Sequence, residues 1–356
     1  MQQSVSGRYA KISAIYLGAA GTGWMAAQVH VPLPWMIGAL VFSTGISLGG
    51  VQIKAPAMTR PAGQIVVAGS VGLAFTPAAL ESLGAMFVPM VIAALLTIAA
   101  GFLVAWVLMR LSDVDAMTAT LASVPMGPVE SAHLAQRYGV NPGPVVFAQT
   151  LRIMALVLLI PPAILLIDGS VADPSETLRN MHWTPTGAAL LIALAVLGAF
   201  AFKMLRVSNP FFLGPLAASA VAAALGLPVT ATPYVVLAGA QVLLGVWLGA
   251  VINRELFRRA GRFVPAALLS TLLMIALCLA LAIALSVVTG TSWPAMVLAT
   301  APGSVTEMAL TAKVLQESVA LVTAYHITRI FIIIPSAPLL TRITARLTHW
   351  TPPKRD

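Results

Sequence analysis

Long apolar runs constrain this chain more than any other feature of its sequence. Three of them cover Phe87–Trp106, Ala188–Phe202 and Val264–Val288, and each is close to the ~20 residues that a helix needs to cross a bilayer. Hydrophobic residues make up 59% of the chain and charged residues only 9%, whereas about 25% of a soluble domain is charged. The sequence therefore predicts an all-α, polytopic membrane protein surrounded by lipid.

The charge and cysteine content exclude several classes of function. The net charge is +9, but Lys and Arg collect in the cytoplasmic loops of membrane proteins, and no basic run with interleaved aromatic residues is present. We therefore expect no nucleic-acid partner. The single cysteine, Cys278, permits no intramolecular disulfide and no cysteine-based metal site. Because no nucleotide motif, metal cluster or Ser/His/Asp set is visible, we expect neither an enzyme nor a bound cofactor or metal.

The chain also contains an internal duplication. Gln64 opens the stretch QIVVAGSVG, and Gln241 opens QVLLGVWLG 177 positions later. The same interval separates Pro125 from Pro302, Glu130 from Glu307, Arg152 from Arg329 and Pro161 from Pro338. A constant interval over several motifs indicates two repeats. We place the first at 8–167 and the second at 184–347, with an acidic linker at 168–183 and a tail at 348–356.

The distribution of basic residues predicts how the repeats cross the membrane. Apolar segments fall at 12–29, 33–50, 62–79, 85–109 and 143–167 in the first half, and at 185–203, 210–227, 234–252, 263–288 and 319–343 in the second. Two segments, 114–140 and 291–316, are less regular. If they cross as well, the repeats are parallel and the arginines of 254–262 lie outside, against the positive-inside rule. If each returns to its own face, the repeats are inverted, with five crossings each. Every basic cluster and both termini are then cytoplasmic, the linker is extracytoplasmic, and the protein belongs in a bacterial inner membrane.

The two irregular segments carry breaks in the middle of apolar sequence. PMGP at 125–128 and PGS at 302–304 each separate two arms of about ten residues, and ten helical residues cover about 15 Å, half the hydrocarbon thickness. We expect two re-entrant hairpins with tips near the bilayer midplane. A full span with an unwound centre is the alternative, and it places the tips at a similar depth.

The chemistry of such tips suits ligand binding. A helix that begins inside the membrane offers unpaired N–H groups to an anion, and the arm that ends there offers carbonyls to a cation. We predict Gly127, Gly303, Ser304 and Thr306 as substrate-binding residues. Glu130 and Glu307 follow the breaks and are candidates for coupling to H⁺ or Na⁺. The alternative is a capping box, which Ser304 and Glu307 fit better than Glu130 does.

Further polar residues lie within the predicted spans. Arg152 and Arg329 need partners at that depth, and each is expected either to pair with the glutamate of its own half or to bind a substrate carboxylate. His326 is three residues before Arg329 and is either a proton relay or a hydrogen-bonded structural residue. Gln64 and Gln241 are predicted to line the cavity. The small residues that follow them (Ala68, Gly72, Gly245, Gly249) predict close helix packing.

The motifs PWMIGALV and APGSVTEMAL, together with the duplication, resemble the AbrB-duplication family of bacterial inner-membrane proteins over essentially the whole chain. Members are often labelled transcriptional regulators or ammonia monooxygenases. Neither label fits these residues, because no DNA-binding motif and no copper or di-iron ligand set is present. The predicted plan is also similar to that of the 2-hydroxycarboxylate and glutamate sodium symporters, at the level of fold analogy.

Inverted repeats with broken helices are typical of secondary transporters. We therefore expect a transporter of a small organic anion coupled to H⁺ or Na⁺, working as a homodimer, in which a unit carrying both hairpins moves against the early spans. The alternative is a membrane sensor that binds a metabolite without transporting it.

Overall fold

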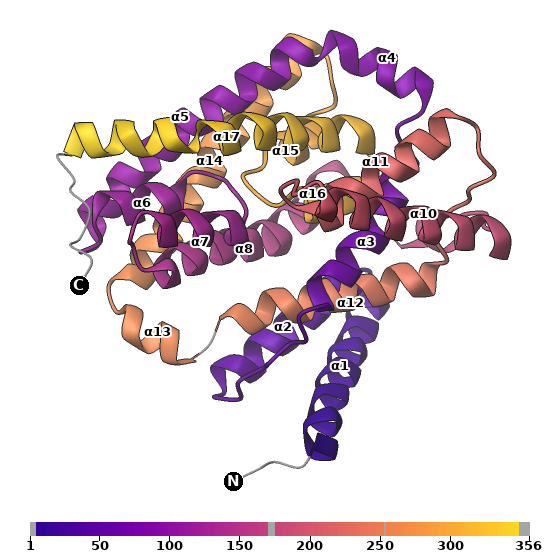
Figure 1. The fold of residues 1–356 in the computed structure, drawn as a ribbon, viewed down its shortest axis with the longest axis horizontal. Coiled ribbons are helices and arrows are strands. Elements are labelled where there is room, and N and C mark those ends of the chain that lie inside the picture. The colour runs from indigo at the N-terminus through magenta and orange to yellow at the C-terminus, as the bar shows by residue number, and fades with distance from the viewer. Residues whose placement is uncertain (1–4, 170–174, 253, 349–356) are drawn as a thin grey trace. The chain divides into compact units, whose positions relative to one another are not determined.

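The computed structural model describes residues 5–169, 175–252 and 254–348 of the chain. Within these ranges the chain is helical and contains no strand (Figure 1). In chain order the helices are α1 (Val5–Gln28), α2 (Pro34–Leu48), α3 (Thr59–Gly72), α4 (Pro77–Ala85), α5 (Phe87–Leu111), α6 (Ala116–Ser123), α7 (Pro128–Arg137), α8 (Pro142–Asp168), α9 (Glu176–Arg179), α10 (Pro185–Met204), α11 (Pro210–Ala224), α12 (Tyr234–Val251), α13 (Arg254–Ala260), α14 (Phe263–Thr289), α15 (Trp293–Thr300), α16 (Val305–Val314) and α17 (Val319–Thr348). The predicted tail beyond Thr348 and part of the predicted linker lie outside the described residues.

Six of the described helices are long and apolar enough to cross a membrane: α5, α8, α10, α12, α14 and α17. They match six of the ten predicted spans. The predicted spans 12–29, 33–50 and 210–227 are helical as well, as α1, α2 and α11. These helices are not among those that are both long and apolar enough to cross a membrane. α2 and α11 are apolar but have 15 residues each, which is about 22 Å of helix against ~30 Å of hydrocarbon.

The predicted continuous span at 62–79 is wrong. α3 ends at Gly72, and α4 begins at Pro77 after a bend of 88°. Proline fits the first turn of a helix but disfavours helical geometry in the residue before it, so Pro77 starts a new helix instead of extending the old one. Counted as one broken span, α3 and α4 bring the candidate crossings to seven.

The helices group into two compact units, each built from both halves of the sequence. The first unit comprises Met1–Ser82, Leu158–Arg254 and Ala309–Ala320, and the second comprises Leu83–Val157, Glu255–Met308 and Leu321–Asp356. The first unit therefore holds α1–α3 and α10–α12, and the second holds α5–α7, α14, α15 and most of α17.

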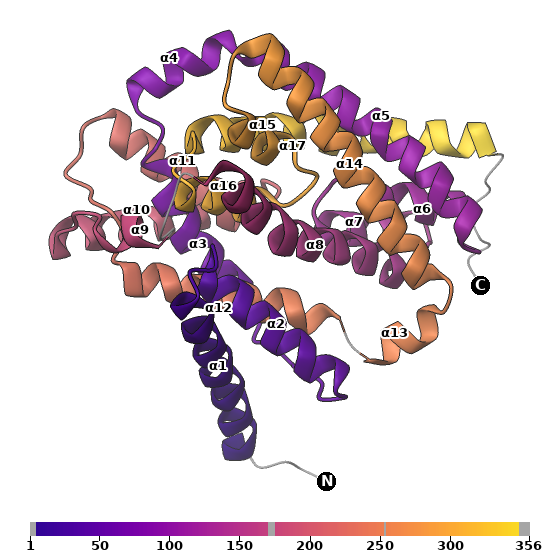
Figure 2. The same cartoon turned by 180° about the vertical axis from the view of Figure 1, so that it is seen from behind.

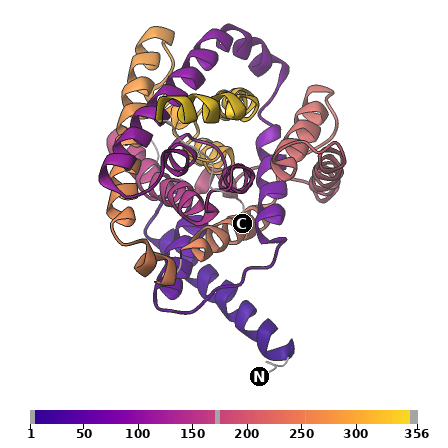
Figure 3. The same ribbon diagram turned by 60° about the vertical axis from the view of Figure 1, so that its left-hand side comes forward.

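In the first unit, equivalent helices of the two halves pack in matching pairs. α2 lies against α1 and α12, while α11 lies against α10 and α3 (Figures 1 and 3). A Cβ atom on Gly245 would lie 2.4 Å from the backbone oxygen of Met36, and one on Gly72 would lie 2.6 Å from that of Leu216. Only a residue without a side chain allows backbones this close. The predicted close packing through small residues is confirmed.

In the second unit, α5 and α14 run side by side (Figure 2), and each also contacts the short helix that follows it, α6 or α15. Val104 of α5 and Met274 and Cys278 of α14 form one buried cluster. Val124, the residue after α6, packs with Ile98 of α5 and Ile333 of α17. The two long apolar helices thus support the breaks that follow them.

Candidate functional site

Both irregular segments fold as a pair of short helices with a four-residue break. The first pair is α6 and α7 around residues 124–127, and the second pair is α15 and α16 around residues 301–304. In the first pair the two helices contact each other, and Met117 of α6 shares an apolar cluster with Ala135 of α7. The predicted breaks are confirmed in both halves.

The sequence explains where these short helices begin. The carboxylate of Asp115 accepts hydrogen bonds from the backbone N–H groups of Met117 and Thr118, both at 3.0 Å, and so caps the start of α6. Pro128 is the first residue of α7, a position where its missing N–H group costs nothing. Gly127 before it is extended, with φ −68° and ψ 150°. The first break is therefore encoded locally.

Two buried residues of α8 bind the carbonyl end of α6. The guanidinium Nη1 of Arg152 donates to the backbone oxygen of Ser123 at 2.8 Å. The amide of Gln149 donates to the oxygens of Leu121 at 2.8 Å and Val124 at 2.9 Å, and its own oxygen accepts a bond from Arg152. A helix leaves its last carbonyls without intrahelical partners, and these bonds satisfy the ones that the break exposes.

The second half repeats this arrangement with a histidine in place of the glutamine. Arg329 donates to the oxygens of Ala301 and Gly303, both at 2.6 Å. His326 Nε2 lies 2.9 Å from the oxygen of Leu298, and its Nδ1 lies 2.7 Å from Arg329 Nη2. Since a carbonyl accepts and a guanidinium donates, this network assigns the proton to Nε2 and leaves the imidazole neutral. The structure therefore places His326 in a structural hydrogen-bond network.

The two networks coincide at the interval of the duplication. Leu121 and Leu298 are 177 positions apart, as are Gln149 and His326. In the described part of the chain, the partners of both arginines are backbone oxygens and a neighbouring side chain rather than Glu130 or Glu307. The two arginines therefore supply a positive charge at each break. The backbone oxygens that would suit a coupling cation already accept hydrogen bonds.

The two glutamates occupy the third position of α7 and of α16. Glu307 is buried, and Glu130 is partly buried. A Cβ atom on Gly127 would lie 2.0 Å from Glu130 Oε2, so this carboxylate turns back over the residue that precedes the helix. A capping box has this geometry. The first half therefore has part of a capping arrangement although it lacks the capping serine of the second half.

The remaining predicted residues lie at the second break and in the first unit. Ser304 directly precedes α16, and Thr306 in its first turn is fully buried. Gly303 is close to Leu156, since a Cβ atom there would lie 2.9 Å from Leu156 Cδ1. Their role as ligand-binding residues stays a prediction.

Gln64 and Gln241 are both buried, in α3 and α12. Gln64 donates to the side-chain oxygen of Asn209 at 3.3 Å. The position that corresponds to Asn209 in the first half is Leu33, and both residues adopt a left-handed conformation before a helix. The side chain of Leu33 offers no hydrogen-bond acceptor. A cavity-lining role for the two glutamines stays a prediction.

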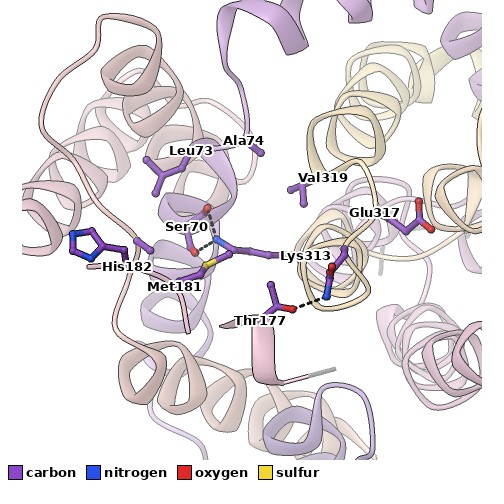
Figure 4. Close-up of a pocket in the computed structure, with 11 residues that line it drawn as sticks. Ser70, Leu73, Ala74, Thr177, Met181, His182, Lys313, Glu317 and Val319 are labelled. Atoms are coloured by element: carbon purple, nitrogen blue, oxygen red, sulfur yellow. Dashed lines mark hydrogen bonds between the residues drawn. The ribbon is translucent and has the colours of Figure 1, made fainter. Parts of the chain in front are cut away.

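A cavity with a volume of about 540 Å³ lies in the first unit (Figure 4). Lys313 of α16 extends into it and donates to the backbone oxygen of Ser70 at 2.9 Å and to its hydroxyl at 2.5 Å. Its other polar lining residues are Thr177, His182, Gln316 and Glu317. Figure 4 shows the carboxylate of Glu317 pointing away from the Lys313 amine. In the described residues the lysine has hydrogen bonds to Ser70 and no ion pair with a carboxylate.

Sequence reasoning missed Lys313, although a signal was present. It lies within the irregular segment 291–316, two turns after the start of the arm that follows the break. An ionisable residue at such a place is a functional candidate by default. What the sequence did not show is that a turn of α3 lies opposite it. Among the described residues, no group of three or more His, Cys, Asp or Glu side chains is placed to hold a metal ion.

These features define a multi-pass helical membrane protein with a duplicated, arginine-anchored helix break. The chain matches the family described as transition state regulatory protein AbrB over residues 35–345, and it belongs to that family. It is similar to the Bacillus subtilis (strain 168) protein YhjN, with 27% identity over 96% of this chain and 94% of YhjN. It is also similar to an Escherichia coli (strain K12) protein named putative regulator AbrB, with 28% identity over 88% of this chain and 90% of that protein. The family resemblance seen in the motifs is confirmed.

Proposed function

We propose that this protein is a secondary transporter of a small organic anion, coupled to H⁺ or Na⁺, and that the Lys313 cavity is where the anion binds. One observation carries the proposal: a lysine on the helix that follows a break projects into a cavity of 540 Å³. Binding sites for small molecules are typically about 300–1,000 Å³.

The amine of Lys313 favours an anion in the cavity. Lys313 presents a charged amine whose bonds within the described chain are to neutral oxygens of Ser70. A buried cation without an opposite charge is costly, and a carboxylate of the ligand offsets that cost. The Gln316 amide Nε2 donates to Thr177 Oγ1 at 2.5 Å, and these two side chains supply further hydrogen-bonding groups to the cavity.

In this proposal the breaks carry the coupling. Glu130 and Glu307 follow the breaks and take up H⁺ or Na⁺. Arg152 and Arg329, which we expected either to pair with the glutamates or to bind the substrate, contribute by fixing the backbone at each break. A unit carrying both broken-helix pairs moves against the early helices, within a homodimer.

The residues that line the cavity suggest the side of the membrane from which the anion enters. Thr177, Met181 and His182 belong to the acidic linker and line the cavity. If both termini are cytoplasmic in a bacterial inner membrane, the linker is extracytoplasmic, and the cavity opens toward the outside. This orientation suits capture of an anion for uptake.

Flux through proteoliposomes tests the proposal. A panel of radiolabelled mono-, di- and tricarboxylates is offered with an inward Na⁺ gradient, an inward H⁺ gradient or no gradient. We expect gradient-dependent uptake of at least one of them, and we expect Lys313→Met to lower that uptake at least tenfold. Lys203→Met, which removes an exposed lysine, is the matched control. Absence of flux under all gradients contradicts the proposal.

A sensor is the second candidate, favoured by the printed name of the Escherichia coli relative, putative regulator AbrB. A sensor binds the same anion at Lys313 but shows no flux. Binding that raises the melting temperature of the wild type but not of Lys313→Met, together with no uptake under any gradient, identifies a sensor.

The coupling residue is tested separately. Glu307→Gln keeps the shape and hydrogen-bonding capacity of the side chain but removes its charge. If Glu307 couples the ion, the variant retains anion binding but loses the dependence of uptake on the gradient. If uptake follows the gradient as in the wild type, Glu307 acts only as a cap.

A further inference from the structure

A second, much smaller cavity lies in the second unit, beside the first break. Its volume is about 10 Å³, which is close to the minimum that holds one water-sized particle. Four of the residues that line it are polar and at most 5% exposed: Ser123, Arg152, Ser270 and Thr271. The hydroxyls of both serines and the Nε atom of Arg152 have no hydrogen-bond partner in the described structure.

Three buried polar atoms around one cavity indicate an occupant. A buried polar group without a partner is costly, so three at one place are hard to explain unless something binds them. Arg152 Nε can only donate, and each serine hydroxyl can donate as well. The hydroxyl of Thr271, which also lines the cavity, can do the same. The lining can therefore present a full set of donors.

The charge around the cavity favours a ligand that carries a negative charge and accepts hydrogen bonds. Arg152 is bonded to Ser123 and Gln149, which are neutral acceptors, so its charge is solvated but not neutralised. An unneutralised charge at low dielectric favours an anion beside it.

The duplicated half provides an internal comparison. At the interval of 177, Ser270 and Thr271 correspond to Ala93 and Ala94, and Ser123 corresponds to Thr300. The hydroxyl of Thr300 is satisfied by the oxygens of Met296 at 2.9 Å and Cys278 at 3.2 Å. The polar lining is thus particular to the first break and is not required by the broken-helix design.

We propose that this cavity is a binding site for one monatomic anion, chloride, held by Arg152 Nε and by the hydroxyls of Ser123 and Ser270. A volume of about 10 Å³ limits the occupant to one small particle, and a halide ion matches the donors and the unneutralised charge. Ser123 is the last residue of α6, and its backbone oxygen already accepts from Arg152. The bound ion therefore holds the side chain of the same residue whose backbone oxygen the guanidinium binds. The site is separate from the Lys313 cavity and does not depend on the proposed transport.

Thermal unfolding of the purified full chain tests the site. Melting temperature is measured in detergent at constant ionic strength while gluconate is replaced by chloride or bromide. We expect halide to raise the melting temperature of the wild type in a saturable way. In the double variant Ser270→Ala, Thr271→Ala, which copies the lining of the second half, we expect apparent halide affinity to fall at least about tenfold, because the Ser270 donor to the ion and the neighbouring hydroxyl of Thr271 are both lost.

Matched controls and a direct probe separate this result from general salt effects. Ser286→Ala changes a serine of the same helix that lies outside the cavity, and it should keep the halide response of the wild type. Crystals grown in bromide should show an anomalous peak beside Arg152. A wild type that responds equally to gluconate and chloride, a double variant with an unchanged response, or density for water without a bromide peak each overturns the proposal.

Discussion

Buried arginines in this protein are solvated by backbone oxygens and by one neighbouring side chain each. Arg152 and Arg329 each donate to carbonyls exposed by a helix break. A planar guanidinium with several donors suits this task, because it can bind two oxygens at once in a fixed geometry. The sequence interval identified these arginines as a pair, but not their partners, because backbone oxygens leave no signature in a sequence.

Replacing Arg329 tests this role. Arg329→Leu leaves the oxygens of Ala301 and Gly303 without the guanidinium, and each orphaned carbonyl costs about 1–3 kcal/mol. We therefore expect the free energy of unfolding to fall by at least ~2 kcal/mol, measured by denaturant titration in detergent. Arg342→Leu, on the same helix but exposed, should have a small effect. Equal stability of the two variants would show that the carbonyls have other partners.

The helix break is the element that both halves share. Its boundaries were predictable, because proline and glycine interrupt helices by steric rules that act on nearest neighbours. Of the arms of about ten residues expected beside the breaks, one folds as α6 at Ala116–Ser123 and another as α16 at Val305–Val314. The side chains that hydrogen-bond to each break were less predictable, because they come from whichever distant helix packs against it.

At the first break, a methyl group tests whether the position of Glu130 matters. In Gly127→Ala the new Cβ atom would lie 2.0 Å from the present position of Glu130 Oε2, which is too close for both atoms to stay in place. The φ of −68° suits alanine, so the fold is retained and the carboxylate moves instead. We expect little change in melting temperature but an altered ion dependence of uptake, like that of Glu130→Gln. Wild-type ion dependence in Gly127→Ala would remove Glu130 from the coupling mechanism.

Helix packing in the first unit gives a prediction with an internal control. Gly245→Ala puts a Cβ atom 2.4 Å from the oxygen of Met36, and α2 must shift to accommodate it. Overpacking of this kind costs about 1–3 kcal/mol. Gly239→Ala on the same helix meets nothing within 4 Å. We expect a lower melting temperature for the first variant and an unchanged or higher one for the second, and the reverse order would contradict the packing described here.

For the whole molecule, the sequence predicted the helical class and, among its ten expected spans, the six helices that are long and apolar enough to cross a membrane. These properties follow from composition and run length, which are sums over many residues. It failed at 62–79, where one proline decides between a single span and a bent pair. It also missed the Lys313 cavity, which is formed by residues from α3, the linker and α16. Sites assembled from distant segments depend on tertiary packing, and local pattern carries little of that information.

The orientation of the two repeats is the remaining prediction at this scale. Inverted repeats place the linker outside and the end of α17 inside, because each half has an odd number of crossings. Parallel repeats place both on the same side. The basic residues favour the inverted arrangement, since it puts every basic cluster in the cytoplasm.

Cysteine labelling distinguishes the two arrangements. The single native cysteine, Cys278, is buried, so an introduced cysteine gives the signal. His182→Cys reports on the linker and Arg346→Cys on the end of α17, and both positions are exposed. With a membrane-impermeant maleimide on spheroplasts, we expect His182→Cys to be labelled directly and Arg346→Cys only after permeabilisation. Labelling of both under the same condition would mean that the segments 114–140 and 291–316 cross the membrane, and the cavity that contains His182 would then face the cytoplasm.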